Sequence, residues 1–213
     1  AYHRRQRQMC IRDSNKTVTV NSITLSDGTN GGLASNYSIG PGQTTTANIT
    51  AKTLTATASA SNKVYDGNDT ATTTLTLSGL IGSETLDATN NTSTFNNKNV
   101  GSNKTVTVNS ITLQDGSGDA DNYSISAGQT TTANITAKAL TVSGITASNK
   151  TYDGNTVATL NTGGVTYTGL VGSDVFNGTY TGAFSDKNVG TGKTVTITPS
   201  YTGADVGNYS VNN

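Results

Sequence analysis

A long internal repeat dominates this sequence and limits what it can fold into. Three pairs of matching segments mark the repeat: Ser61–Asn68 and Ser148–Asn155, Asn15–Val20 and Asn103–Val108, and Ala47–Lys52 and Ala133–Lys138. Matching segments lie roughly 86 to 90 residues apart, a domain-sized period rather than the about 20 to 50 residues of a solenoid. Tandem domains of one kind provide length, reach and copy number, and they seldom build an active site.

The repeat divides the chain into four parts. Residues 1–14 form an N-terminal tail, 15–52 the C-terminal half of repeat one, 53–138 a complete repeat two, and 139–213 a repeat three without its last strand. An incomplete repeat leaves unpaired strand edges and an open core. We therefore expect repeat two to be independently stable, repeat three to be weakened, and repeat one to be unable to fold alone.

The N-terminal tail differs in composition from the rest of the chain. It contains the only His, the only Cys and the only Met of the sequence, and every Arg. A signal peptide needs an apolar run after its charges, and none follows here. Read in frame, Met9–Ser14 resembles an adapter used in DNA sequencing libraries, so we exclude the tail from the fold. A basic arm that binds nucleic acid is the alternative.

The composition of the remaining chain excludes several function classes. The full sequence balances 13 basic against 13 acidic residues, but without the tail 9 Lys face 12 Asp and Glu, a net charge of −3. The absence of Cys, His, Arg and Trp removes Cys/His zinc sites, thiol nucleophiles and Ser-His-Asp triads. No basic patch for nucleic acid remains, and no run is apolar enough to cross a membrane. We expect no catalysis, no nucleic-acid binding and no membrane insertion in this segment.

Short alternating segments separated by Gly, Asn and Asp turns fill repeat two, the pattern of a sandwich or barrel. Thr72–Leu77 alternates, whereas the alternation that precedes Asn109 and Ser110 changes phase there, which predicts a bulge or bend. We expect Tyr123–Ile125 and Ala133–Ala137 to pair as a closing hairpin. No window shows a sustained 3.6-residue period, so helix content should be very low.

Two further patterns recur in the repeats. A Tyr-Asp-Gly turn occurs twice, as Tyr65, Asp66 and Gly67 and as Tyr152, Asp153 and Gly154. An Asn-Tyr-Ser segment holds Tyr123 and Tyr209, and Asp205–Tyr209 has the Asp-x-Gly-x-Tyr form of an immunoglobulin tyrosine corner. The alternative is that these tyrosines are ordinary core aromatics with a solvated hydroxyl. The patterns predict an all-β chain of tandem immunoglobulin-like sandwiches, with a β-grasp-like fold as the alternative.

One loop is a candidate metal site. Asp115, Asp119 and Asp121 lie in a Gly-rich turn whose carboxylates are suitable ligands for Ca²⁺. The spacing is not that of an EF-hand, and the corresponding loops of the other repeats lack the carboxylate cluster, so a solvated turn is the favoured interpretation. We expect no other cofactor.

Together these segments resemble the YDG repeat family of bacterial surface proteins. The segments that carry the resemblance are Lys63–Gly67, Lys150–Gly154, the two Gly-Leu-x-Gly-Ser loops, Lys98–Gly101, Lys187–Gly190, the Lys-Thr-Val-Thr strands and the Asn-Tyr-Ser segments. Such repeats occur in very large secreted or surface proteins, often similar to filamentous haemagglutinins. The resemblance implies a stalk or adhesin segment outside a bacterial cell, associated with the outer membrane. It also implies neighbouring repeats as partners, with host or biofilm glycans or proteins as further ones, and no catalytic residues.

A carbohydrate-binding β-sandwich module is the alternative function. Such a module presents exposed aromatic side chains on one face. Tyr167, Tyr180 and Tyr201 of repeat three are the candidates for that face.

Overall fold

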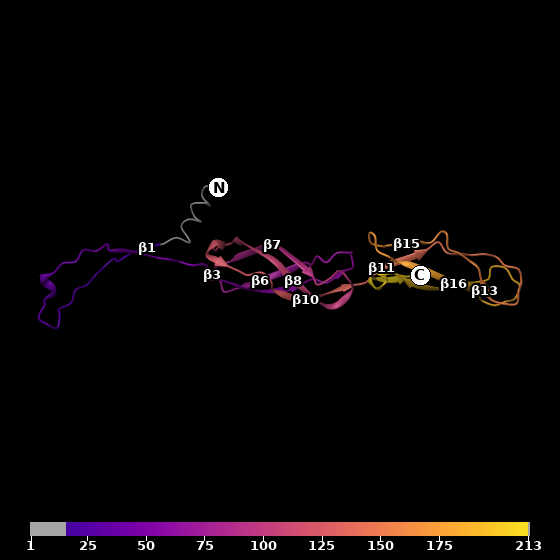
Figure 1. The fold of residues 1–213 in the computed structure, drawn as a ribbon, viewed down its shortest axis with the longest axis horizontal. Coiled ribbons are helices and arrows are strands. Elements are labelled where there is room, and N and C mark those ends of the chain that lie inside the picture. The colour runs from indigo at the N-terminus through magenta and orange to yellow at the C-terminus, as the bar shows by residue number, and fades with distance from the viewer. Residues whose placement is uncertain (1–15, 213) are drawn as a thin grey trace, which may run out of the picture. The chain divides into compact units, whose positions relative to one another are not determined.

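The computed structural model describes residues 16–212 and is built almost entirely of β-strands (Figure 1). The N-terminal tail, assigned above as foreign to the fold, lies outside the described residues. The strands are β1 (Lys16–Thr19), β2 (Thr44–Ala47), β3 (Lys52–Thr53), β4 (Thr55–Ala60), β5 (Lys63–Val64), β6 (Thr73–Ser78), β7 (Leu86–Phe95), β8 (Gly101–Asp115), β9 (Tyr123–Ser124), β10 (Thr130–Thr136), β11 (Lys138–Ser143), β12 (Thr146–Ala147), β13 (Val157–Ala158), β14 (Leu160–Asn161), β15 (Thr166–Thr168), β16 (Asn177–Phe184), β17 (Val195–Thr202) and β18 (Tyr209–Asn212). The helical content is three single turns, η1 (Ala34–Asn36), η2 (Ala120–Asn122) and η3 (Val206–Asn208), which confirms the all-β prediction.

The described chain forms two compact units, and neither coincides with a sequence repeat. Unit one contains residues 16–55, Leu77–Thr89 and Leu113–Ser126. Unit two contains Ala56–Thr76, Asn90–Thr112 and residues 127–212. Repeat two therefore contributes to both units, and repeat three lies wholly in unit two.

Unit one has a small apolar core beside the exposed hairpin of repeat one. The hairpin pairs β1 with β2 antiparallel, and β3 pairs with β9 in parallel. The buried members of the core are Leu54, Leu86 and Tyr123, and Leu77, Leu80, Leu113, Ala120 and Ile125 pack against them. Every residue of β2 is exposed.

Unit two has the larger core, to which repeats two and three both contribute. Its main sheets have the strand orders β5-β10-β8-β7, β15-β11-β18 and β13-β16-β17, with the pairs β4-β6 and β12-β14. The buried core consists of Tyr65, Phe95, Val106, Ala133, Ile135, Leu140, Phe176 and Tyr209. This mixture of β-branched, leucine and aromatic side chains is what a pleated, half-buried strand face accommodates best.

The predicted alternation is confirmed, and so is its change of phase. Residues of β6 alternate between half-buried and exposed. In β8, Val106 and Val108 are buried, whereas the neighbours Ser110 and Ile111 are both half-buried, so the inward phase changes there. The strand continues through this point without a break. The change allows one long strand to contribute Val106 and later Leu113 to two different cores.

The predicted closing hairpin is wrong. Residues Tyr123 and Ser124 of β9 pair in parallel with β3, whereas β10 pairs antiparallel with β8 and parallel with β5. Gly128 has a φ of 97°, and its N–H bonds the carbonyl of Val108 at 2.8 Å. The turn therefore directs β10 onto β8 rather than back along β9.

Candidate functional site

Side chains of the Tyr-Asp-Gly turn close the turn locally. In repeat two, Lys63 pairs with Asp66 at 2.8 Å and donates hydrogen bonds to the carbonyl and side-chain oxygens of Asn68 at 2.9 Å. Asp66 accepts the Asn68 N–H at 3.1 Å, and Gly67 takes a φ of 84°, which favours glycine. All of these contacts are local in sequence, so the turn forms without help from another repeat.

Repeat three builds the same turn from the same residue types. Lys150 pairs with Asp153 at 2.7 Å, the Asn155 N–H donates to Asp153 at 3.2 Å, and Gly154 has a φ of 80°. The hydrogen bond from Lys150 is the main reason that the pKa of Asp153 lies below its ordinary value. The two turns thus have one local structure.

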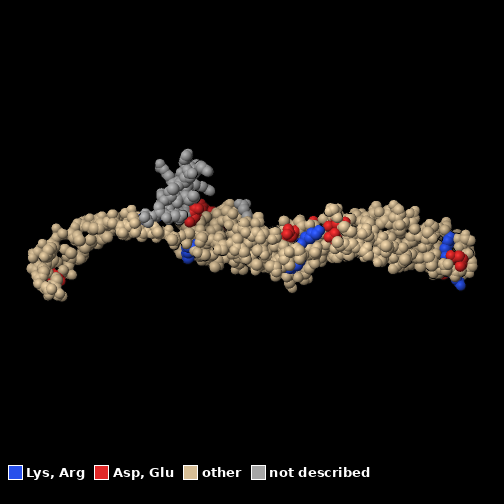
Figure 2. Space-filling model, viewed as in Figure 1, with Lys and Arg blue, Asp and Glu red and all other residues tan. Residues whose placement is uncertain are grey.

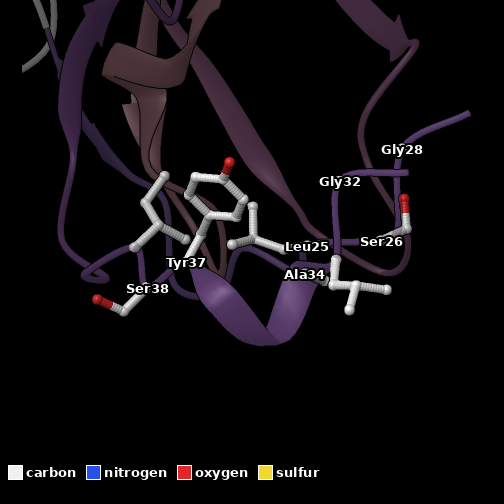
Figure 3. Close-up of a pocket in the computed structure, with 9 residues that line it drawn as sticks. Leu25, Ser26, Gly28, Gly32, Ala34, Tyr37 and Ser38 are labelled. Carbon is white, nitrogen blue, oxygen red and sulfur yellow. The ribbon is translucent and has the colours of Figure 1, made fainter. Parts of the chain in front are cut away.

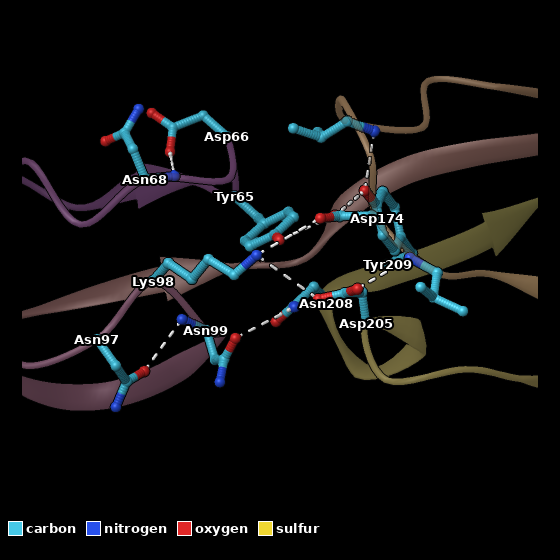
Figure 4. A network of polar contacts seen from close by, with 12 residues as sticks. Tyr65, Asp66, Asn68, Asn97, Lys98, Asn99, Asp174, Asp205, Asn208 and Tyr209 are labelled. Atoms are coloured by element: carbon cyan, nitrogen blue, oxygen red, sulfur yellow. Dashed lines mark hydrogen bonds and ion pairs between the residues drawn. The ribbon is translucent and has the colours of Figure 1, made fainter.

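A network of polar contacts joins repeat two to repeat three within unit two (Figure 4). We call it the junction network, and its members are Tyr65, Lys98 and Asn99 of repeat two and Asp174, Asp205, Asn208 and Tyr209 of repeat three. Only Ala137 separates the last strand of repeat two, β10, from the first strand of repeat three, β11. The network therefore lies where the backbone passes from one repeat into the next.

Asp174 is the centre of the junction network. It accepts hydrogen bonds from the hydroxyls of Tyr65 at 2.9 Å and Tyr209 at 2.5 Å, and it pairs with Lys98 at 3.5 Å. Lys98 also pairs with Asp205 at 3.6 Å. The side chain of Tyr65 is 1% exposed, and its ring meets the ring of Tyr209 edge to face at 5.6 Å between centroids. The junction thus combines an aromatic contact of defined edge-to-face geometry with hydrogen bonds and ion pairs around it.

The side chain of Asn208 in repeat three forms two hydrogen bonds with repeat two. Its side-chain oxygen accepts the N–H of Val100 at 3.0 Å, and its amide donates to Asn99 at 3.3 Å. Asn208 is buried, so these bonds satisfy polar atoms that solvent does not reach. Gly67 also lies close to repeat three, because a Cβ at this position would lie 2.8 Å from a methyl carbon of Val171.

The electrostatics of the junction favour an ionised Asp174. Burial raises the pKa of Asp174, but the hydrogen bonds from Tyr209 and Tyr65 and the charge of Lys98 lower it by more. The pKa therefore lies below its ordinary value of 3.8. Burial, followed by the hydrogen bond to Asp174, raises the pKa of Tyr209 to about 12. The same causes raise the pKa of Tyr65. One buried carboxylate is thus held between two neutral hydroxyls and an ammonium group.

In repeats two and three, the tyrosine of the Asn-Tyr-Ser segment is hydrogen-bonded to the Gly-Leu-x-Gly-Ser loop of its own repeat. The hydroxyl of Tyr209 accepts the Val171 N–H at 2.9 Å. The hydroxyl of Tyr123 accepts the Ile81 N–H at 3.1 Å and donates to Glu84. Both rings are buried, and the bonded backbone lies 38 and 42 residues upstream, rather than a few residues upstream as in an immunoglobulin corner. These tyrosines are therefore core aromatics with a specific hydroxyl partner.

Three residues that match junction positions are exposed elsewhere in the described chain. Tyr152, the counterpart of Tyr65, is 58% exposed, and Val189, the counterpart of Val100, is 89% exposed. Asn122, the counterpart of Asn208, is also exposed. Sequence reasoning identified the tyrosines but missed Lys98 and the other polar members. Their occurrence at matching positions in both repeats is the signal that would have found them.

Repeat one presents its own tyrosine in an open pocket of about 410 Å³ (Figure 3). Residues that line it are Leu25, Ser26, Gly28, Gly32, Leu33, Ala34, Tyr37, Ser38 and Ile39. Tyr37 is 69% exposed, whereas Tyr123 at the matching position is 7% exposed. In the described part of repeat one, no Gly-Leu-x-Gly-Ser loop lies over Tyr37 as one does over Tyr123.

The candidate Ca²⁺ loop uses its carboxylates to shape the backbone. Asp115 accepts the Ala120 N–H at 2.8 Å, and Asp119 accepts the Asp121 N–H at 3.1 Å. Within residues 16–212, no group of three or more His, Cys, Asp or Glu side chains is close enough to hold a metal ion. The three aspartates are thus not brought together.

The aromatic side chains of repeat three pack on one another. Tyr167 and Tyr201 contact Phe176 with centroid distances of 5.3 Å and 5.2 Å, and the hydroxyls of Tyr167 and Tyr180 lie 3.2 Å apart. All three tyrosines are half-buried. They form part of the packing of repeat three rather than an exposed platform.

Much of the surface in view in Figure 2 is uncharged, and the charged side chains gather in small groups. Groups of both signs lie next to each other, as the local lysine–aspartate pairs require. Among the described residues, no helix has the length and apolar character needed to traverse a bilayer.

Comparison with known proteins identifies the family. The model of the YDG domain matches residues 50–133 and again 136–213, close to the limits of repeats two and three. No curated protein and no solved structure matches this chain. Because the two matches cover most of the sequence, this chain belongs to the YDG domain family.

Proposed function

We propose that this chain is a structural and adhesive repeat segment, a stalk or spacer, of a large secreted or surface-attached bacterial protein of the filamentous haemagglutinin kind. The observation that carries the proposal is the junction network, in which Asp174 is held by Tyr65, Lys98 and Tyr209. Most multidomain chains join their domains by exposed, flexible linkers. Here a single residue, Ala137, separates the strands of successive repeats.

Physical arguments connect such a junction to a spacer. A buried tyrosine and a buried asparagine at the boundary restrict rotation of one repeat against the next. A tandem array of such repeats therefore keeps a defined orientation along its length. Repeats of this kind project a distal binding region or present weak contacts many times over. The proposed role is non-catalytic and extracellular, with neighbouring repeats as the direct partners.

The mechanical part of the proposal is tested by the joint orientation of repeats two and three in solution. Residual dipolar couplings of β10 and β16 in the full chain should fit one alignment tensor. In the double variant Tyr65→Ala, Asp174→Asn they should require two. A wild-type chain that already requires two tensors would contradict a stiff spacer.

The adhesive and surface part needs separate measurements. Antibodies raised against this chain should label intact cells of its source without permeabilisation, and labelling only after lysis would contradict a surface location. On a glycan array, a spacer should give no binding. Saturable binding that is lost in Tyr180→Ala or Tyr201→Ala would instead favour the carbohydrate-binding module.

A further inference from the structure

Repeat three contains a group of three tyrosines that repeat two does not have. Tyr167 lies in β15, Tyr180 in β16 and Tyr201 in β17, and all three side chains are half-buried. Repeat two contains only Tyr65 and Tyr123. These two belong to the Tyr-Asp-Gly turn and the Asn-Tyr-Ser segment, which repeat three has as well. The three tyrosines are therefore an addition to the plan that the repeats share.

The hydroxyls of Tyr167 and Tyr180 contact each other directly. Their oxygen atoms lie 3.2 Å apart, so one hydroxyl donates a hydrogen bond to the other. Burial, followed by this hydrogen bond, raises the pKa of Tyr180 above its ordinary value, so its hydroxyl keeps its proton at neutral pH. The pair is thus made of two neutral phenols held head to head.

Gly178 provides the space in which the two hydroxyls meet. A Cβ at this position would lie 2.8 Å from the hydroxyl oxygen of Tyr167, and closer still to that of Tyr180. Any other residue at position 178 would therefore displace the pair. The close contact between the two phenols depends on a glycine beneath both of them.

Aromatic contacts connect this pair to the rest of the cluster and to solvent. The ring of Tyr201 meets the ring of Tyr180 edge to face at 6.2 Å between centroids. Phe176 contacts the rings of both Tyr167 and Tyr201. Because the three tyrosines are only half-buried, a small oxidant reaches the cluster, and rings in contact allow an electron vacancy to move between them.

The pair also spans two different sheets of unit two. Tyr167 belongs to the sheet β15-β11-β18, and Tyr180 belongs to the sheet β13-β16-β17. A covalent bond between these side chains would join the two sheets directly. Residues 16–212 contain no Cys, so no disulfide within them provides such a link.

The tyrosine pair of the junction network is arranged differently. Tyr65 and Tyr209 both donate to the same carboxylate oxygen of Asp174, so their hydroxyls share an acceptor rather than contact each other. The side chains of Tyr65 and Tyr209 are also buried, at 1% and 8% exposure. Direct contact between hydroxyls, together with access from solvent, is thus found at Tyr167 and Tyr180.

We propose that Tyr167 and Tyr180 form a site of oxidative cross-linking, where hydrogen peroxide, activated by a haem peroxidase, joins the two rings as dityrosine. Each phenol loses its hydroxyl proton and one electron, and the two radicals form one bond between the carbons ortho to their oxygens. The hydrogens on these carbons then move to the oxygens. The two electrons and two protons that were released reduce one peroxide to two water molecules.

The hydrogen-bonded geometry already resembles that of the product. In dityrosine the two hydroxyls flank the new bond side by side, and in repeat three they lie 3.2 Å apart before any reaction. Reacting groups held in such an arrangement combine within one molecule rather than by collision between molecules. This proposal does not depend on the spacer function.

Treatment of the full chain with a haem peroxidase and hydrogen peroxide tests the proposal. We expect a monomeric product that has lost two hydrogen atoms and shows dityrosine fluorescence. Mass spectrometry of a digest should find the peptides of Tyr167 and Tyr180 linked. The yield per chain should not depend on protein concentration, because both rings belong to one molecule. Links between Tyr37 or Tyr152 of different molecules should instead increase with concentration, since these rings are mostly exposed.

Two conservative variants separate the pair from the other tyrosines. Tyr180→Phe keeps the ring but removes the hydroxyl, so it should lower the yield of the intramolecular product at least about tenfold. Tyr152→Phe is the matched control, because it removes a mostly exposed phenol outside the cluster and should leave that yield unchanged. Oxidation should raise the thermal midpoint of the wild type but not that of Tyr180→Phe, since a cross-link between two sheets restricts the unfolded chain.

Two results would overturn the proposal. One is a protein in which the exposed tyrosines have been oxidised while Tyr167 and Tyr180 remain unlinked. The other is an undiminished yield of the intramolecular product in Tyr180→Phe, which would place the reaction at another pair of tyrosines.

Discussion

Repeats two and three carry the same Tyr-Asp-Gly turn, but only the turn of repeat two is covered. Both turns have the same lysine–aspartate pair and the same left-handed glycine. Tyr65 is buried against repeat three, whereas Tyr152 remains largely exposed. The turn is therefore a property of the local sequence, and burial of its tyrosine is a property of the neighbouring repeat.

The same difference extends to the second contributing segment. In repeat two, Lys98, Asn99 and Val100 all have partners in repeat three. In repeat three the matching residues 187–189 are exposed. The surface of repeat two is thus buried by Asp174 and Asn208 of repeat three, whereas the matching surface of repeat three has the same local turn and is exposed. Substitutions made in pairs, at matching positions of repeats two and three, separate the stability that comes from local contacts from the stability that comes from contacts between repeats.

The largest effect is expected for the paired tyrosines. Tyr65→Ala should lower the free energy of unfolding by about 3 to 5 kcal/mol, because it removes a buried aromatic ring from the core. Tyr152→Ala should change it by less than about 0.5 kcal/mol, since this ring is mostly exposed. Urea denaturation of the full chain measures both. Equal losses would show that the tyrosine stabilises its own turn and not the junction.

The central carboxylate should give the next largest effect. Asp174→Asn keeps the shape of the side chain but replaces an ionised acceptor of three donors, at a cost of about 2 to 3 kcal/mol in unfolding free energy. Urea denaturation followed by intrinsic tyrosine emission should report it. As a control, Asp153→Asn in the exposed turn of repeat three should unfold close to the wild-type midpoint. A wild-type midpoint for Asp174→Asn would remove Asp174 from the centre of the junction.

The paired glycines isolate a single contact across the junction. Gly67 and Gly154 have nearly the same positive φ, so alanine introduces the same backbone strain at both. Only at Gly67 would the new methyl group meet Val171, at 2.8 Å. We expect Gly67→Ala to cost about 1 to 2 kcal/mol more than Gly154→Ala, the usual range for overpacking. Equal thermal shifts in the two variants would show that the repeats do not approach as closely as the structure has them.

Local features were predictable from the sequence, because their causes lie within a few residues. The Tyr-Asp-Gly turns need only an aspartate, a glycine and an asparagine in order. The alternation of β6 and the phase change of β8 follow from which side of a pleated strand is apolar.

Pairings between distant segments were not predictable in the same way. Tyr123–Ile125 and Ala133–Ala137 are adjacent in sequence, but β9 pairs with β3 about 70 residues upstream, a choice that depends on the whole core. The junction network could not be predicted from the sequence for a related reason. Nothing near Lys98 indicates that its partners, Asp174 and Asp205, belong to the next repeat.

Acid should weaken the junction. A carboxyl group whose folded pKa is depressed contributes stability that is complete above its unfolded pKa and is lost as pH falls through the folded value. The pKa of Asp174 is held below 3.8, so the free energy of unfolding should fall as pH drops below about 4. Midpoints measured from pH 6 to pH 2 should fall less steeply in Asp174→Asn. The variant curve will not be flat, because Asp66, Asp153 and Asp186 also have lowered pKa values. Parallel curves would contradict this role of Asp174.

The smallest effect is expected for the lysine that bridges the junction. Lys98 contacts Asp174 and Asp205 at 3.5 and 3.6 Å, but its side chain is 41% exposed, so solvent screens both pairs. Lys98→Met should lower the unfolding midpoint slightly at low ionic strength and not at all in 1 M NaCl, where charges at the surface are screened within about 3 Å. Lys187→Met, at the matching uncovered position, should have no effect in either condition. A loss for Lys98→Met that persists in high salt would mean that the ammonium group of Lys98, which lies over the ring of Tyr65 at 5.9 Å from its centroid, contributes by a direct cation–π contact that salt does not screen.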